Sequence, residues 1–157
     1  MKNEMIIEFD AVSENEGFAR VAVAAFMTPL NPTLEEISDV KTAVSEAVTN
    51  AVIHGYEKQG RIWLRCRISG DVLHIEVEDR GKGIENVELA MEPLFTTCPE
   101  QNRSGMGFSF MEAFMDDLEV ESEPEKGTVV RMVKKLGVCP WIDEGELEIC
   151  GRGISTD

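Results

Sequence analysis

Apolar residues recur at helical spacing in residues 14–27 and again in the segment that follows Thr33. Thr33 and Glu36 have the spacing of a capping box, in which each side chain accepts a hydrogen bond from the backbone amide of the other residue. Both segments are therefore predicted to be amphipathic helices, with Gly55 just past the end of the second. The apolar positions are Phe18, Val21, Ala22, Ala25 and Phe26 in the first helix, and Ile37, Val40, Ala43, Val44, Ala47, Val48 and Ala51 in the second.

Alternation of apolar and polar residues predicts strands, because successive strand residues point to opposite faces of a sheet. The alternation is clearest in residues 72–78, and residues 61–68 precede them across a tight turn that contains Gly70. Residues 80–104 show no convincing period, and a connection of this length indicates a functional lid or a disordered segment. Further strands are predicted at residues 5–12, 118–122 and 128–135, and a further helix at residues 108–115.

The order of these elements predicts an α+β fold, a two-layer α/β sandwich with helices on one face of a mostly antiparallel sheet. Residues 1–137 are expected to form one domain, and residues 138–157 an acidic C-terminal tail. The longest apolar runs fall far short of the roughly 18 residues that a membrane helix needs, and no signal peptide opens the chain. We therefore expect a cytoplasmic protein with no membrane partner.

Thirty acidic residues against fifteen basic ones give a formal net charge of −15. An acidic surface repels phosphate backbones, so direct nucleic-acid binding is not expected, and a basic protein partner would be attracted instead. The alternative is that the acidic excess only keeps the protein soluble. The four cysteines lack the paired spacing of a structural zinc site and are expected to be free thiols.

Glu46, Asn50 and His54 lie four residues apart on the second predicted helix. At about 100° per residue, each lies about 40° further round the helix than the one before. Glu46 and Asn50 fall at the polar border of the apolar stripe, where a carboxylate and an amide can serve a proton and a hard metal ion. Taken alone, the same spacing is also that of a solvated helix face.

Two glycine-rich turns follow this helix. Asp79 ends a predicted strand, and Gly81 and Gly83 allow a ligand to approach the backbone closely. The glycines of residues 105–107 lead into the last predicted helix, whose free amides favour phosphate. Ordinary turns are the alternative for both, because Asp and Gly are frequent turn residues.

In combination and in this order, these segments resemble the Bergerat-fold ATP-binding superfamily, which includes gyrase, Hsp90, MutL and histidine kinases. AVSEAVTNAVIHGY is similar to the N box of that superfamily, VEDRGKGI to its G1 box and RSGMGFS to its G2 box. PLFTT lies at the position of the ATP lid, and EKGTVVRM holds the closing Gly127-Thr128 pair.

The resemblance implies a role for each matching position. Glu46 would be the general base that takes the proton of an attacking hydroxyl, and Asn50 would ligand the Mg²⁺ that accompanies ATP. Asp79 would accept a hydrogen bond from the adenine amine, with Thr128 beside it through water. His54 lies on the nucleotide side of the N box, and a packed helix-end histidine is the alternative. The other positions expected to contact ATP are Gly81, Lys82, Gly83, Ile84, Thr96, Thr97, Arg103, Ser104, Gly105, Met106, Gly107 and Phe108.

The gyrase, Hsp90 and MutL types need a further transducer domain, and this chain ends soon after its last predicted strand. A histidine kinase needs an upstream phosphoacceptor histidine, and no histidine precedes His54. Unless the chain is a fragment, we expect a free-standing ATP-binding domain that phosphorylates a protein. Residues 1–136 are similar to the anti-sigma serine kinases of Gram-positive bacteria, particularly the anti-sigma F family of spore formers.

This second resemblance implies that the chain binds and inhibits a sporulation sigma factor of the sigma F type. It also implies phosphorylation of a serine on an anti-anti-sigma factor, and a homodimer as the working form. Arg20, the only cation between Lys2 and Lys41, is a candidate partner contact, with a solvated arginine as the alternative. Two other functions stay open: a stress-response type of anti-sigma kinase, and a nucleotide-gated sigma-binding module without significant kinase activity.

Overall fold

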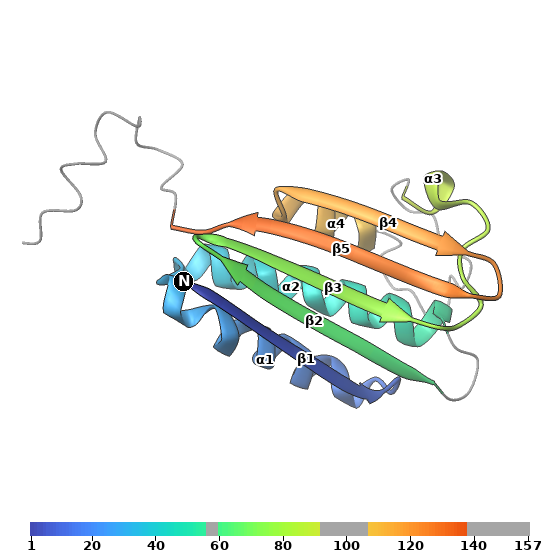
Figure 1. Cartoon of the computed structure of the whole chain (residues 1–157). Coiled ribbons are helices and arrows are strands. Elements are labelled where there is room, and N and C mark those ends of the chain that lie inside the picture. The colour runs from blue at the N-terminus through green and yellow to red at the C-terminus, as the bar shows by residue number, and fades with distance from the viewer. Residues whose placement is uncertain (56–59, 92–106, 138–157) are drawn as a thin grey trace, which may run out of the picture.

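The computed structural model describes residues 1–55, 60–91 and 107–137. In Figure 1 the sheet lies in front, and the three longest helices lie behind it on one face. The predicted tail of residues 138–157 is outside the described residues, so its boundary stays a prediction. The elements are β1 (Lys2–Asp10), α1 (Glu14–Met27), η1 (Thr28–Leu30), α2 (Leu34–Asn50), η2 (Ala51–Gly55), β2 (Arg61–Ser69), β3 (Val72–Asp79), α3 (Val87–Ala90), α4 (Gly107–Phe114), β4 (Asp117–Glu123) and β5 (Gly127–Lys135).

The described strands form one five-stranded sheet in the order β1-β2-β3-β5-β4. Every neighbouring pair is antiparallel, so the sheet is more regular than the mostly antiparallel one that the sequence predicts. The inward-facing residues of the strands and the buried residues of α1, α2 and α4 form a single hydrophobic core. The predicted α+β fold, with helices on one face of the sheet, is confirmed.

Strand boundaries differ from the predicted ones by a few residues. The sequence predicts the first strand at residues 5–12, but β1 runs from Lys2 to Asp10, because Lys2 pairs with Ser69 and Asp10 with Arg61 at the two ends of β2. Pairing along the whole length of β2 therefore extends β1 to residues that show little alternation of apolar and polar positions. The segment without a convincing period also contains one short helix, α3, which is too short to show a period.

The start of helix α2 is as predicted. The Thr33 amide donates to the Glu36 carboxylate at 2.8 Å, and the Glu36 amide donates to the Thr33 hydroxyl at 3.1 Å, which completes the capping box. The apolar stripe of α2 lies in the core, where Val40, Val44 and Val48 are fully buried. This burial fixes the rotation of α2 about its own axis.

The end of α2 differs from the prediction. The sequence places Gly55 just past the helix, but the backbone continues as a π-helical turn, η2, and Gly55 is its last residue. The Ala51 amide is shared between the carbonyls of Ala47 and Val48, where the regular hydrogen-bond pattern changes. Turns of this kind are frequent near functional sites.

Helix α1 forms as predicted, and its fully buried residues are not among the apolar positions named for it from the sequence. Ala19, Val23 and Met27 are fully buried, whereas Phe18 is 54% exposed and Val21 is 59% exposed. Between Phe18 and Met27 the only polar residue is Arg20, so periodicity alone does not choose a face. The smaller Ala19 and Val23 suit close packing against α2, so tertiary packing selects the buried face of α1.

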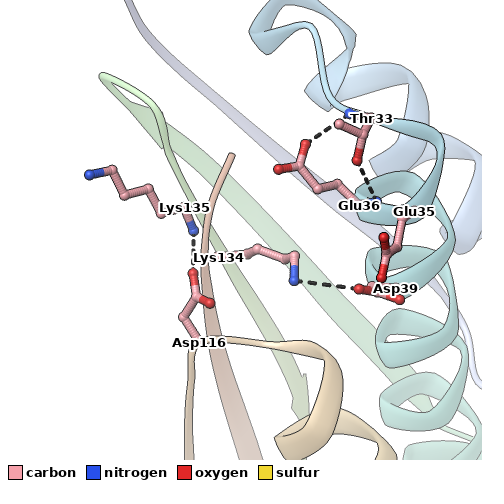
Figure 2. A pocket seen from close by; sticks show the side chains of 7 residues that line it. All are labelled: Thr33, Glu35, Glu36, Asp39, Asp116, Lys134 and Lys135. Carbon is pink, nitrogen blue, oxygen red and sulfur yellow. Dashed lines mark hydrogen bonds and ion pairs between the residues drawn. The ribbon is translucent and has the colours of Figure 1, made fainter. Parts of the chain in front are cut away.

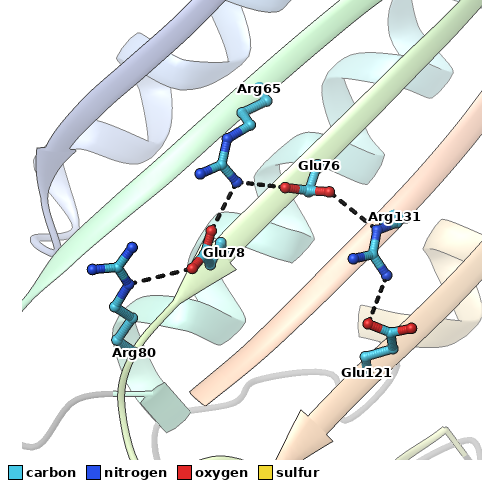
Figure 3. Close-up of polar contacts among 6 residues, drawn as sticks. All are labelled: Arg65, Glu76, Glu78, Arg80, Glu121 and Arg131. Carbon is cyan, nitrogen blue, oxygen red and sulfur yellow. Dashed lines mark hydrogen bonds and ion pairs between the residues drawn. The ribbon is translucent and has the colours of Figure 1, made fainter. Parts of the chain in front are cut away.

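The sheet face opposite the helices carries a chain of ion pairs, which Figure 3 shows. Arg65 bridges Glu76 and Glu78, at 2.5 Å and 2.7 Å, and Arg131 bridges Glu76 and Glu121, at 3.0 Å and 2.8 Å. All five side chains are partly or largely exposed, and such pairs contribute little stability each. No described helix covers this face, which explains why charged residues occupy many of its strand positions.

The rotation of α1 can be tested by two matched substitutions. Val23→Ala should lower the free energy of unfolding by about 2 kcal/mol, because it removes two buried carbons. Val21→Ala removes the same atoms from the exposed face and should change stability by less than about 0.5 kcal/mol. Urea unfolding followed by circular dichroism measures both, and equal losses would contradict the observed rotation.

Candidate functional site

The C-terminal half of α2 meets the first residue of α4 at a small, polar contact. Glu46 and Asn50 are half-buried on α2, and Gly107 begins α4 and is buried. A Cβ at Gly107 would lie 3.0 Å from Asn50 Nδ2 and 3.1 Å from Glu46 Oε2. The two side chains therefore converge on one point, and glycine is the residue that leaves them room.

The carboxyl of Glu46 is a stronger base than an ordinary glutamate. Burial raises its pKa, and the negative charge of Glu16 on α1 raises it further. Glu16 accepts a hydrogen bond from the Ser45 hydroxyl and pairs with Arg20 at 3.7 Å. No sequence motif singled out Glu16, because its position beside α2 depends on how the two helices pack.

Asp79 is the second polar centre of the site. It is the last residue of β3 and is 5% exposed on the helix-covered face. Its Oδ1 accepts the Gly81 amide at 3.0 Å. Burial raises the pKa of Asp79 to about 6, and the backbone N–H groups of Gly81 and Thr128 oppose this only in part. Ionised Asp79 is therefore unfavourable without further hydrogen bonds, and its carboxylate is suited to accept one from a ligand.

Asp79 belongs to a row of residues that crosses the sheet. Phe9 pairs with Ile62, Ile62 with Asp79, and Asp79 with Thr128, so these four residues lie side by side on the inner face. All four are buried. The row changes from apolar to polar at β3, while η2 contacts both β3 and β5. The C-terminal end of α2 and the polar half of the row therefore face the same region.

Two glycines allow the backbone after Asp79 to press against the β4–β5 hairpin. At Gly83, with φ of +73°, a Cβ would lie 2.3 Å from the Glu123 carbonyl oxygen. At Gly127, with φ of +107°, it would lie 2.1 Å from the Asp79 carbonyl oxygen. A side chain at either position would be strained and would force the two segments apart. Because these two residues have no side chain, the loop that follows Asp79 can pack closely against the hairpin.

The remaining predicted site residues divide into two groups. Lys82, Ile84 and Phe108 are described: the Lys82 carbonyl accepts the Glu125 amide at 2.7 Å, and Phe108 is partly buried against the core. His54 lies in the η2 turn, and its predicted role is untested. Thr96, Thr97, Arg103, Ser104, Gly105 and Met106 lie outside the described residues, as does most of the predicted lid.

The donors at the α2–α4 contact suit a hard cation. Asn50 offers an amide oxygen to such a cation beside Gly107, and the neighbouring Glu46 carboxylate is left to take a proton. Mg²⁺ is usually held by one or two protein oxygens together with water and substrate phosphates. Within the described residues, no group of three or more His, Cys, Asp or Glu side chains could hold a metal ion by itself. The residues present therefore fit a cation that arrives with a phosphate ligand.

A separate pocket of about 350 Å³ lies at the other end of α2. Figure 2 shows the capping-box residues Thr33 and Glu36 on one side of it and Lys134, 3.7 Å from Asp39, on the other. Its lining contains none of the predicted site residues. We assign it no part in the chemistry. In the part of the chain that the structure describes, no helix is both long and apolar enough to cross a membrane.

Residues 10–134 match the family model described as a histidine kinase-like ATPase domain. The chain is 60% identical over 136 residues to the anti-sigma F factor of Thermoanaerobacter sp. (strain X514), which covers 86% of this chain and 95% of that one. It is 52% identical over 138 residues to the anti-sigma F factor of Bacillus subtilis (strain 168), with 87% of this chain and 94% of the relative covered.

Among solved structures, the chain is similar to the RsbU and RsbW domains of Rv1364c from Mycobacterium tuberculosis, with a TM-score of 0.62 and 21% sequence identity. The match covers 85% of this chain and 32% of that longer one. At this identity the likeness supports the fold alone.

The raised pKa of Asp79 predicts a pH-dependent stability. Folded Asp79, at about 6 against an ordinary 3.8, holds its proton more tightly than the unfolded chain does. Its stabilising contribution is therefore full below about pH 4 and is lost as the pH rises through about 6, a change of about 2 to 3 kcal/mol. Asp79→Asn removes this titration. Between pH 4 and pH 7.5, the unfolding free energy of the unchanged protein should therefore fall by this amount more than that of Asp79→Asn.

Urea unfolding of the two proteins at several pH values measures the difference. The exposed Asp71 is the matched control, because Asp71→Asn keeps Asp79 and should keep the fall in stability that Asp79 causes. A difference between the unchanged protein and Asp79→Asn that is constant with pH would contradict the raised pKa.

Proposed function

This chain belongs to the anti-sigma F factor family and carries a histidine kinase-like ATPase domain, and we propose that it is an ATP-dependent protein serine kinase. Its substrate is a serine of an anti-anti-sigma factor, and its inhibited partner is a sporulation sigma factor of the sigma F type. It acts in the cytoplasm, through residues 1–137 as the kinase domain.

The observation that favours an enzyme over a binding module is the state of Glu46. A half-buried carboxyl with a raised pKa, beside Asn50 and close to Gly107, is suited to take a proton. Sequestration of a sigma factor needs no such base. The proposal therefore assigns Glu46 to catalysis.

In the proposed reaction, the substrate serine oxygen forms a bond to the γ-phosphorus of ATP. The bond between that phosphorus and the β–γ bridging oxygen breaks, and ADP leaves with the electron pair. The Glu46 carboxylate takes the serine proton. Asn50 would hold the Mg²⁺, which would neutralise charge on the phosphates.

The nucleotide base lies at the polar half of the cross-strand row. Asp79 accepts a hydrogen bond from the adenine amine, and Thr128 lies beside it on β5. Gly81, Lys82, Gly83 and Ile84 border the base. The proposed phosphate and lid contacts are Thr96, Thr97, Arg103, Ser104, Gly105, Met106, Gly107 and Phe108, with His54 on the nucleotide side.

The acidic charge of the chain supports the choice of partners. A net charge of −15 attracts a sigma factor whose polymerase-binding and DNA-binding faces are basic. Phosphate on the anti-anti-sigma factor adds about two negative charges and so weakens its hold on an acidic kinase. We also propose a homodimer, for which the uncovered sheet face, with Ile6 67% exposed, is available.

Two substitutions separate the proposed roles on α2. Glu46→Gln should slow phosphoserine formation by about 10²- to 10⁴-fold while MgATP affinity stays near normal, because only the base is lost. Asn50→Ala should weaken magnesium-dependent nucleotide binding itself. The measurements are transfer of labelled γ-phosphate to a purified anti-anti-sigma factor, with phosphoserine located by mass spectrometry, and calorimetric nucleotide titration.

Glu35→Gln is the matched control, since Glu35 is an exposed acid on the first turn of the same helix. It should leave both measurements unchanged. Near-normal turnover by Glu46→Gln would exclude Glu46 as the base. No phosphoserine with the unchanged protein would favour the nucleotide-gated binding module, and transfer only to a stress-response antagonist would favour the related kinase type.

Arg20 is the proposed partner contact on α1. Its side chain is 42% exposed and pairs with Glu16 at 3.7 Å, so it is held in place yet open to a partner. Arg20→Ala should weaken binding to the sigma factor or the anti-anti-sigma factor by about tenfold or more and leave MgATP affinity intact. Lys135→Ala, which removes an exposed cation at the far end of β5, is the control. Unchanged partner affinity for Arg20→Ala would remove this role.

A further inference from the structure

Ser122 on β4 extends the polar row that contains Asp79. The strand register pairs Asp79 with Thr128 and Thr128 with Ser122, so the three side chains lie side by side on the inner face across β3, β5 and β4. No motif in the sequence singled out Ser122. Its place in the row nevertheless puts its hydroxyl beside the proposed base-binding residues.

The Ser122 hydroxyl contacts three groups of different hydrogen-bonding character. The Ile84 amide donates to it at 2.7 Å, the Gly127 carbonyl lies at 3.1 Å, and the Thr128 hydroxyl lies at 2.8 Å. Ile84 comes from the loop after Asp79, and the other two come from β5. One hydroxyl thus joins the loop to the β4–β5 hairpin.

Proton accounting fixes the direction of the third contact. A serine hydroxyl has one proton to give and two lone pairs to receive with. The Ile84 amide can only donate, and the Gly127 carbonyl can only accept, so the single proton of Ser122 goes to Gly127. All three contacts are satisfied only if the Thr128 hydroxyl donates to the second lone pair of Ser122.

This direction decides what the site offers to a ligand. With its proton committed to Ser122, the Thr128 hydroxyl offers only lone pairs to a ligand that contacts it. Ionised Asp79 is also an acceptor and has no proton to give. The row therefore presents acceptors alone, which suits an exocyclic amine and disfavours a carbonyl oxygen in the same place.

We propose that Ser122 is a positioning residue for base recognition: by holding the Thr128 proton, it makes the site select a 6-aminopurine nucleotide over a 6-oxopurine nucleotide. The inference rests on the proposed function, since it refines how the same site recognises ATP. Ser122 acts through Thr128 and the Ile84 loop, and it needs no contact of its own with the nucleotide.

The test compares the dissociation constants of MgATP and MgITP at pH 8, where Asp79 is ionised. The unchanged protein should prefer ATP. Ser122→Ala frees the Thr128 proton to face a carbonyl, so the ATP-over-ITP preference should fall by about tenfold, the effect of one hydrogen bond of typical strength. Ser122→Thr keeps the hydroxyl and should restore most of the preference.

Val120→Ala is the structural control, because Val120 is an inward-facing residue of the same strand without a polar group. It should leave the preference unchanged even if it lowers stability. Thermal unfolding of each variant reports whether it is folded. A folded Ser122→Ala variant with the same ATP-over-ITP ratio as the unchanged protein would overturn the inference and leave Ser122 a purely structural residue.

A measurement on the unchanged protein covers the case in which Ser122→Ala does not fold. Purine riboside triphosphate has neither the amine nor the carbonyl, so an acceptor-only site should bind it less tightly than ATP and more tightly than ITP. ITP binding as tightly as purine riboside triphosphate, or more tightly, would contradict the inference while the proposed function stands. Absence of binding by all three nucleotides would overturn the proposed function as well.

Discussion

The burial of one apolar face of α2 against the inner face of the sheet is the interaction on which the rest of the site depends. Val40, Val44 and Val48 fill the core and fix the rotation of the helix, and this rotation places Glu46 and Asn50 at the border of the buried stripe. Both side chains are half-buried as a consequence of this rotation. The positions of Glu46 and Asn50 therefore follow from the packing of the core.

The same periodicity argument governs the sheet. Alternation places Asp79 on the inner face, at the point where the cross-strand row passes from Phe9 and Ile62 to polar residues. A buried carboxylate there is costly, which the raised pKa expresses. The close backbone contacts at Gly83 and Gly127 keep the loop and hairpin around Asp79 in place. A carboxylate held in this way is preorganised to accept hydrogen bonds from a ligand, and such bonds would offset the free energy of burying it.

Sequence was a good guide wherever a local pattern determined the structure. The capping box and apolar stripe predicted α2, alternation predicted β2 and β3, and the order of motifs predicted the fold class. The buried face of α1 could not be predicted, because most residues from Phe18 to Met27 are apolar and tertiary packing selects the face. Glu16 and Ser122 were also missed, because each reaches the site across a contact between elements distant in the chain. Such residues have no signature in a single sequence.

We propose that α2 and the polar half of the cross-strand row form the two walls of one ATP site. A crystal structure of this chain with Mg²⁺ and a non-hydrolysable ATP analogue would test this arrangement. We expect the adenine amine within hydrogen-bonding distance of the Asp79 carboxylate, and the Asn50 side-chain oxygen about 2.1 Å from Mg²⁺. A nucleotide bound elsewhere, or one whose metal is held without Asn50, would contradict it.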